Sequence, residues 1–219
     1  AAPITCKPRE HGAHVVVYST TKYIGGHGTS IGGIIVDSGT FDWEKNAERF
    51  PLLNQPDPSY HGAVWTEAVK PLGPIAYILK ARVTLQRDLG YALSPFNAFQ
   101  LIQGLETLPL RIREHCRNAE QVARFLADHR DVPSVTYPSL QEGEARRRAE
   151  SYLFGGYGGL VCFELAGGAE AGRRFIDSLE LFHHVANIGD ARSLAIHPAT
   201  TTHSQLSAED QLASGATEG

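Results

Sequence analysis

Residues 14–28 read HVVVYSTTKYIGGHG, an apolar run followed by hydroxyl side chains, a lysine and three glycines. The run is β-branched and continuous, which predicts a strand buried on both faces, as in a parallel sheet. A second short strand is predicted at 33–37, GIIVD. Because glycine lets a backbone approach a ligand closely, the segment between the two strands is expected to hold a ligand.

The lysine of this segment is the main candidate for chemistry. Ser19 and Thr21 stand at alternate positions beside Lys22, so their hydroxyls can point the same way and donate to phosphate oxygens. A desolvated lysine forms Schiff bases with aldehydes. Pyridoxal phosphate carries both an aldehyde and a phosphate. On spacing alone, a solvated lysine at the end of a strand remains the alternative.

The clearest helix is predicted to begin at Ser94-Pro95, because serine is a good N-cap and proline suits the first helical position. Pro109 is expected to kink or break this helix. Apolar side chains, many of them three residues apart, are expected to form its buried stripe. The members of that stripe are Phe96, Phe99, Ile102, Leu105, Ile112, Ala119, Val122 and Leu126.

Helical and strand patterns alternate along the whole chain, which predicts an α/β fold. Helices are expected near 43–49, 65–69, 75–89, 142–151 and 169–179, and further strands near 132–137, 160–165 and 193–196. Because the helix that begins at 95 is long enough to bridge two domains, we predict domains at 1–95 and 96–219.

Composition narrows the function classes. The 24 acidic and 20 basic residues give a formal net charge of −4, so a nucleic-acid role that depends on bulk positive charge is not expected. No apolar run approaches the roughly 20 residues of a membrane span. The three cysteines lie far apart and the histidines lack zinc-site spacing, so no metal is expected. This cysteine usage favours a reducing, cytoplasmic compartment.

Several segments resemble the cysteine/methionine-metabolism family of pyridoxal-phosphate enzymes, which have fold type I. Residues 15–28 resemble the region of its cofactor lysine, and the resemblance spans nearly the whole chain. The Asn-Ile-Gly-Asp motif and the long insertion between Asp37 and Lys80 favour its O-acetylhomoserine sulfhydrylase members. The further matching segments are SPFNAF at 94–99, GLETL at 104–108, GYGGLV at 156–161, ANIGD at 186–190 and HPATTTH at 197–203.

The resemblance implies roles for four residues. Lys22 would be the Schiff-base lysine and proton shuttle, Ser19 and Thr21 would bind the cofactor phosphate, and Asn187 would contact the substrate carboxylate. The implied reaction is γ-replacement, in which O-acetylhomoserine and sulfide give homocysteine and acetate, a step of methionine biosynthesis. Cystathionine γ-synthase, cystathionine γ-lyase and methionine γ-lyase activities are the alternatives.

The resemblance also implies an incomplete site. Residues 1–95 would be the C-terminal part of a cofactor-binding large domain with a mainly parallel sheet, and 96–219 most of a smaller α/β domain. The family's aspartate at the pyridine nitrogen, its stacking aromatic, its phosphate loop and its substrate arginine have no counterpart here. We therefore expect an internal fragment of a homotetrameric enzyme, close to inactive alone; a non-catalytic fragment or interaction module is the alternative.

Overall fold

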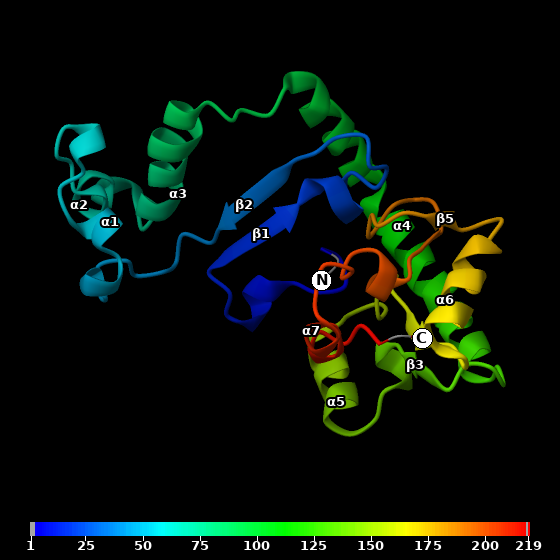
Figure 1. Cartoon of the computed structure of the whole chain (residues 1–219). Coiled ribbons are helices and arrows are strands. Elements are labelled where there is room, and N and C mark those ends of the chain that lie inside the picture. Colours follow the sequence, from blue (N-terminus) through cyan, green and yellow to red (C-terminus); the bar gives the residue numbers. More distant parts are fainter. Residues whose placement is uncertain (1–2, 218) are drawn as a thin grey trace. The chain divides into compact units, whose positions relative to one another are not determined.

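The computed structural model describes residues 3–217 and 219, which form two compact units. Unit 1 consists of the described residues up to Lys7, Thr20–Ile31 and Gln100–Gly219. Unit 2 consists of Pro8–Ser19 and Gly32–Phe99. Both helices and strands occur along the chain, which agrees with the predicted α/β class (Figure 1). The division into domains 1–95 and 96–219 stays a prediction.

Unit 2 contains a two-stranded antiparallel sheet, made by β1 (Val15–Ser19) and β2 (Gly33–Asp37). The prediction that the first strand is buried on both faces in a parallel pairing is wrong for the described residues, since Val17 is 68% exposed. An apolar run indicates a strand, but pairing direction follows from the connection. The segment between β1 and β2 holds one short helical turn rather than the crossover helix of a parallel pair.

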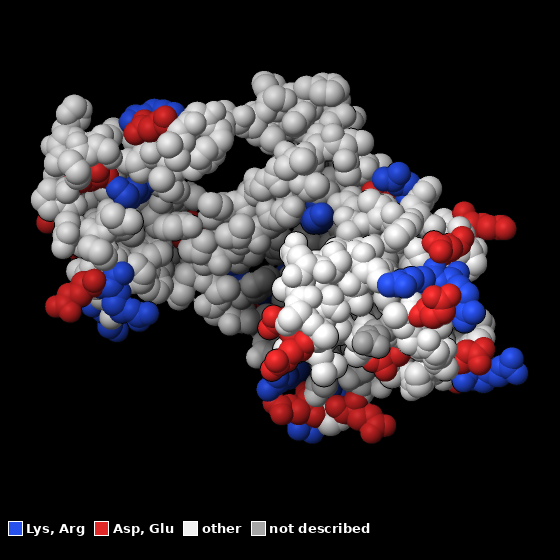
Figure 2. Space-filling view, in the orientation of Figure 1, with Lys and Arg blue, Asp and Glu red and all other residues white. Residues whose placement is uncertain are grey.

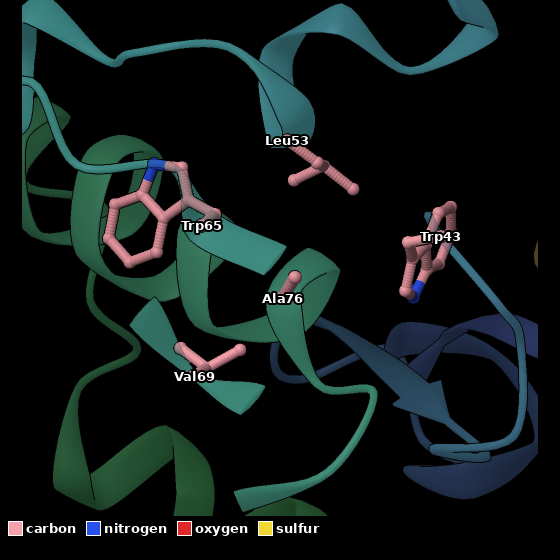
Figure 3. Close-up of a cluster of buried hydrophobic side chains, with 5 residues drawn as sticks. All are labelled: Trp43, Leu53, Trp65, Val69 and Ala76. Atoms are coloured by element: carbon pink, nitrogen blue, oxygen red, sulfur yellow. The ribbon is translucent and has the colours of Figure 1, made fainter. Parts of the chain in front are cut away.

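The core of unit 2 lies in the segment that follows the sheet. The short helices of this segment are α1 (Pro51–Asn54), α2 (Trp65–Ala68) and α3 (Ala76–Lys80). Its helical turns lie at Ala47–Arg49, Pro58–Tyr60, Lys70–Leu72 and Ala81–Arg87, and a further turn, Pro8–His11, precedes the sheet. These elements confirm the helices predicted near 65–69 and 75–89, whereas the helix predicted near 43–49 is limited to the turn Ala47–Arg49. The core side chains, drawn in Figure 3, are Trp43, Leu53, Trp65, Val69 and Ala76.

Unit 1 is built along α4 (Pro95–Ala127), whose first turn belongs to unit 2. The other helices are α5 (Gly143–Tyr152), α6 (Gly168–Asp177) and α7 (Ala208–Ala213), with helical turns at Thr20–Ile24, Pro138–Leu140 and Pro198–Thr200. Strands β3 (Ser134–Thr136) and β4 (Cys162–Glu164) pair antiparallel. Strands β5 (His183–His184) and β6 (Leu194–Ala195) pair parallel.

The buried face of α4 differs from the predicted stripe. Phe96, Phe99, Ile102 and Leu105 are all more than half exposed, so their assignment to the core is wrong. A constant spacing of three drifts around a helix of 3.6 residues per turn, whereas a mixture of spacings of three and four stays on one face. The buried positions follow the second pattern: Leu101, Gly104, Leu108, Ile112, Cys116, Ala119 and Ala123.

Pro109 does not end α4, which continues to Ala127. Proline removes one backbone donor, so the carbonyl of Leu105, four residues earlier, loses its partner in the helix. Leu105 lies at a half-exposed position of the helix. The predicted break at Pro109 is absent, and the alternative of a kink stays a prediction.

Two surface properties complete the description. No helix in residues 3–217 and 219 combines the length and apolar character needed to cross a membrane. On the face shown in Figure 2, acidic and basic side chains lie close to one another, and neither sign forms one continuous patch.

Candidate active site around Lys22

Lys22 lies at a break in a helical turn. The turn spans Thr20–Ile24, and its backbone leaves helical values at Lys22, where φ is −84° and ψ is −129°. Two hydrogen bonds close the turn. The Gly25 amide donates to the Thr20 carbonyl and the Gly26 amide to the Lys22 carbonyl, each with a length of 2.8 Å. The backbone of Lys22 is therefore held from within the turn.

Helix α4 packs directly on this turn through Gly104. A Cβ at position 104 would lie 2.5 Å from the Gly25 carbonyl oxygen and 2.6 Å from that of Ile24. Real Cβ atoms essentially never come so close to another heavy atom. Only glycine allows this packing of the helix against the lysine turn.

Arg111 holds the same turn through its guanidinium group. It donates to the carbonyl oxygens of Tyr23 at 2.8 Å, Ile24 at 3.1 Å and Gly104 at 2.6 Å. Burial lowers the pKa of Arg111 from its ordinary value. A cation at this position satisfies carbonyl groups of both the turn and α4, and so ties the two together.

A second segment, residues 187–192, packs on the lysine turn from far along the chain. The Ala191 amide donates to the Gly26 carbonyl over 2.7 Å. Gly189 has φ of +86°, and a Cβ there would lie 2.5 Å from Cγ of Tyr23. The close approach of Gly189 to Tyr23 thus depends on a glycine in a left-handed conformation.

The glycines after Lys22 let other parts of the protein approach the turn closely, and the ligand expected at this segment stays a prediction. A Cβ at Gly26 would lie 2.3 Å from a guanidinium nitrogen of Arg111. A Cβ at Gly28 would lie 3.0 Å from the amide nitrogen of Asn187. Their role in the described structure is to let the turn and its neighbours pack closely.

A chain of polar contacts begins at the ammonium group of Lys22. Lys22 Nζ donates to Oδ1 of Asn187 at a distance of 3.1 Å, and Asn187 Nδ2 donates to Oδ2 of Asp190 at 3.0 Å. Arg192 donates to both Asp190 oxygens, from Nε and Nη2, each over 3.0 Å. Asp190 is 3% exposed, and its bonds to Arg192 hold the pKa of that carboxyl well below its usual range.

Tyr23 and His115 form an aromatic pair beside this chain. Their rings meet edge to face, with centroids 5.8 Å apart. Burial raises the pKa of Tyr23. Burial, and then the charge of Arg111, lower the pKa of His115, which favours the neutral ring. In the part of the chain that the structure describes, His115 Nε2 is buried without a hydrogen-bond partner.

The structure brings Lys22 and Asn187 into contact, although 165 positions separate them. Thr21 is half-buried in the lysine turn, and Ser19 is exposed at the end of β1, in unit 2. Within residues 3–217 and 219, the hydroxyl of Thr20 is buried and unpaired. Asn187 uses both ends of its amide on protein groups, and its substrate role stays a prediction.

Sequence reasoning missed Arg111, His115, Asp190 and Arg192. Asp190 stood in the Asn-Ile-Gly-Asp motif, so its carboxylate could have been weighed beside Asn187. Arg111 and His115 carry no signal of their own, because charged side chains on a long amphipathic helix usually face solvent.

The residues present fit pyridoxal phosphate by their chemistry. Lys22 supplies an amine for the aldehyde, and its partner Asn187 is a neutral amide rather than a carboxylate that would favour the ammonium form. The hydroxyls of Ser19 and Thr21 are suited to phosphate oxygens. In the described residues, no group of three or more His, Cys, Asp or Glu side chains is arranged to hold a metal ion.

Known relatives share this chain over its full length. It is 50% identical to O-acetyl-L-homoserine sulfhydrylase of Leptospira meyeri, covering 100% of this chain and 50% of the relative. It is 43% identical to homocysteine/cysteine synthase of Saccharomyces cerevisiae, covering 97% of this chain and 50% of the relative. The chain thus spans about half the length of the curated relatives it matches.

Solved structures agree. A Campylobacter jejuni structure described as an O-acetylhomoserine (thiol)-lyase, with pyridoxyl-lysine-5′-monophosphate, has a TM-score of 0.90 at 41% identity and covers 99% of this chain and 51% of that chain. A cystathionine γ-synthase structure from Xanthomonas oryzae pv. oryzae has a TM-score of 0.73 at 32% identity. The match covers 99% of this chain and 46% of the cystathionine γ-synthase chain. The family described as Cys/Met metabolism PLP-dependent enzyme matches residues 1–219. This chain therefore belongs to the Cys/Met metabolism family of PLP-dependent enzymes.

Proposed function

We propose that this chain is part of a pyridoxal-phosphate transferase that makes homocysteine from O-acetylhomoserine and sulfide. A C–S bond forms at the γ-carbon, the C–O bond to acetate breaks, and no oxidant or reductant is needed. The observation that carries the proposal is the Lys22–Asn187 contact, in a chain half of whose residues are identical in an O-acetylhomoserine sulfhydrylase.

Lys22 has two roles in this proposal. Its amine binds the cofactor aldehyde, and once free it moves protons at the α- and β-carbons of the substrate. When bound, pyridoxal phosphate supplies an electron sink for the carbanions that these proton transfers create. Proton transfer requires a positioned amine, and Lys22 is positioned by its turn and by Asn187.

The remaining site residues have binding roles. We propose that Ser19 and Thr21 donate to the cofactor phosphate, and that Asn187 contacts the substrate carboxylate when substrate is present. Tyr23 and His115 pack edge to face beside the lysine turn, and we propose that their rings shield one side of it. The partners are small molecules, and we further propose a cytoplasmic homotetramer with domains at 1–95 and 96–219.

Reduction with borohydride tests the cofactor assignment directly. Intact mass and peptide sequencing of the reduced chain should find one phosphopyridoxyl group, on Lys22. An unmodified mass after incubation with pyridoxal phosphate would contradict cofactor binding by this chain and favour the non-catalytic alternative. An adduct on another lysine would contradict the role of Lys22.

A second candidate activity is cystathionine synthesis, which the similarity to the Xanthomonas cystathionine γ-synthase favours. The two activities share the donor chemistry and differ in the thiol that attacks the γ-carbon. The enzyme purified from its source should use sulfide in preference to cysteine. A preference for cysteine would replace the proposal with cystathionine synthesis, and release of an α-keto acid without an added thiol would indicate a γ-lyase.

A further inference from the structure

The amide of Asn187 lies between two groups with opposite hydrogen-bonding demands. On one side is the Lys22 ammonium, 3.1 Å from Oδ1, and on the other the Asp190 carboxylate, 3.0 Å from Nδ2. An ammonium only donates and an ionised carboxylate only accepts, whereas an amide offers one oxygen acceptor and one nitrogen donor. Only one orientation of the Asn187 amide satisfies both neighbours.

Asp190 is fixed more firmly than either of the other two residues. The backbone amide of Arg192 donates to its Oδ1 over 2.9 Å, and the Arg192 guanidinium donates to both oxygens. Together with Asn187, these donors occupy both oxygens of a carboxylate that is 3% exposed. The loop that carries it is attached to the lysine turn by the bond from Ala191 to Gly26.

We propose that Asp190 is a positioning residue for Lys22, because it fixes the Asn187 amide with its oxygen toward the lysine amine. The negative charge of Asp190 thereby orients Lys22 indirectly, through the Asn187 side chain that lies between them. A carboxylate directly against Nζ would favour the ammonium, whereas Schiff-base formation needs the neutral amine. The orientation rests on geometry alone, and its meaning for catalysis rests on the proposed function.

Competitive acetylation of lysines tests the orientation. The chain without added cofactor is treated with an amine-acetylating reagent at neutral pH, and peptide mass spectrometry gives the rate at Lys22 relative to the exposed Lys45. In Asp190→Asn the new amide can donate to the Asn187 oxygen and compete with Lys22. We expect several-fold faster acetylation of Lys22. The increase should be the same in Asn187→Ala and no larger in the combined variant Asn187→Ala/Asp190→Asn.

Exchanging the two side chains separates orientation from general damage. In the double variant Asn187→Asp/Asp190→Asn, the carboxylate at 187 can accept from Lys22 with one oxygen and from the amide at 190 with the other. Acetylation of Lys22 should return to the wild-type rate or below it. A variant that had merely loosened the loop would stay as fast as Asp190→Asn alone.

Asp88→Asn is the matched control, since it removes one carboxylate from an exposed pair with Arg87, in unit 2. It should leave the Lys22 rate unchanged. A wild-type rate in Asp190→Asn, or a fast rate in the exchange variant, would overturn the proposal. If Asp190→Asn does not fold by circular dichroism, an unchanged rate in Asn187→Ala overturns it as well. The borohydride result is independent, so failure of the proposed function leaves this test intact.

Discussion

Lys22 of unit 1 and Lys80 of unit 2 are both held by fixed partners, but the partners differ in charge. Lys80 donates to the carboxylate of Asp57, whose side chain is 6% exposed. The same carboxylate accepts from the indole of Trp65 at 2.7 Å and from the hydroxyl of Ser59 at 2.6 Å. Lys22 donates to the neutral amide of Asn187.

The difference separates a structural lysine from a chemical one. A carboxylate at contact distance ties Lys80 to the packing of its surroundings, because separating the pair would leave a buried charge without its partner. The Lys80 ammonium also lies 5.6 Å from the centre of the ring of Trp65, a core residue of unit 2. An amide partner positions Lys22 without placing a full charge beside it.

The largest expected effect is the loss of the cofactor adduct when Lys22, but not Lys80, is replaced by arginine. Lys22→Arg should abolish the borohydride-trapped adduct, because a guanidinium forms no Schiff base with the cofactor. In the source enzyme, loss of a positioned proton carrier should lower the rate by about 10²–10⁴-fold. Lys80→Arg keeps the cation beside Asp57 and should keep the adduct. Intact mass spectrometry of the two reduced variants gives the comparison, and an adduct retained in Lys22→Arg would remove the distinction between the lysines.

Arg111→Met should have the largest effect on the stability of unit 1. The change leaves carbonyl groups of Tyr23, Ile24 and Gly104 without their charged donor, and should lower the free energy of unfolding by about 2 kcal/mol. Urea unfolding followed by helical circular dichroism measures it. Arg117→Met on the same helix removes an exposed pair with Glu114 and should cost less than about 0.5 kcal/mol. Equal losses in the two variants would mean that Arg111 does not support the lysine turn.

The sequence predicted the lysine site better than it predicted what supports it. Lys22 and Asn187 were both singled out, and the structure places them in hydrogen-bond contact. The spacing of Ser19, Thr21 and Lys22 made the lysine a candidate with a solvated lysine as the alternative, and the resemblance to the family then implied the roles of Lys22 and Asn187. Arg111 could not be identified, because whether an arginine on a helix faces carbonyls or water depends on what packs against that helix.

The fold was predictable to the extent that local signals determine it. Serine and proline at 94–95 gave the start of α4, since capping depends only on adjacent residues. Ile112 and Ala119 are buried as predicted. The first half of the buried face of α4 was misassigned, because Phe96 and Phe99 are more hydrophobic than Gly104, which is buried for its small size. The pairing direction of β1 also depends on tertiary structure, which a run of valines does not encode.

A smaller effect is expected for Gly104→Ala. Alanine in place of glycine inside a helix usually gains about 1 kcal/mol. Here the added Cβ would meet backbone oxygens of the lysine turn at 2.5 and 2.6 Å, and overpacking of this kind costs about 1–3 kcal/mol. We expect a net loss of about 1 kcal/mol by urea unfolding, together with faster acetylation of Lys22. Leu105→Ala, at a half-exposed neighbouring position, should change stability by less than about 0.5 kcal/mol. A stabilised Gly104→Ala variant would mean that α4 does not pack this closely on the turn.

The last and smallest expected effect is the loss of stability of unit 2 on acidification. It tests the Lys80 side of the comparison. Hydrogen bonds from Lys80, and then from Ser59 and Trp65, hold the pKa of Asp57 well below its usual range. An aspartate in the unfolded chain titrates near 3.9, so below about pH 4 the unfolded state binds a proton that the folded state does not. Stability is therefore fully present above that pH and falls as the pH drops toward the folded pKa.

Tryptophan fluorescence isolates this effect, because both tryptophans of the chain, Trp43 and Trp65, lie in the core of unit 2. Urea midpoints followed by fluorescence should decline steadily on acidification below about pH 4. In Asp57→Asn the midpoint should be lower at neutral pH and should decline less on acidification, whereas Asp88→Asn should keep the wild-type slope. Equal slopes in wild type and Asp57→Asn would mean that the Lys80 pair contributes nothing through its charge. The contrast between Lys80 and Lys22 would then rest on their reactivity alone.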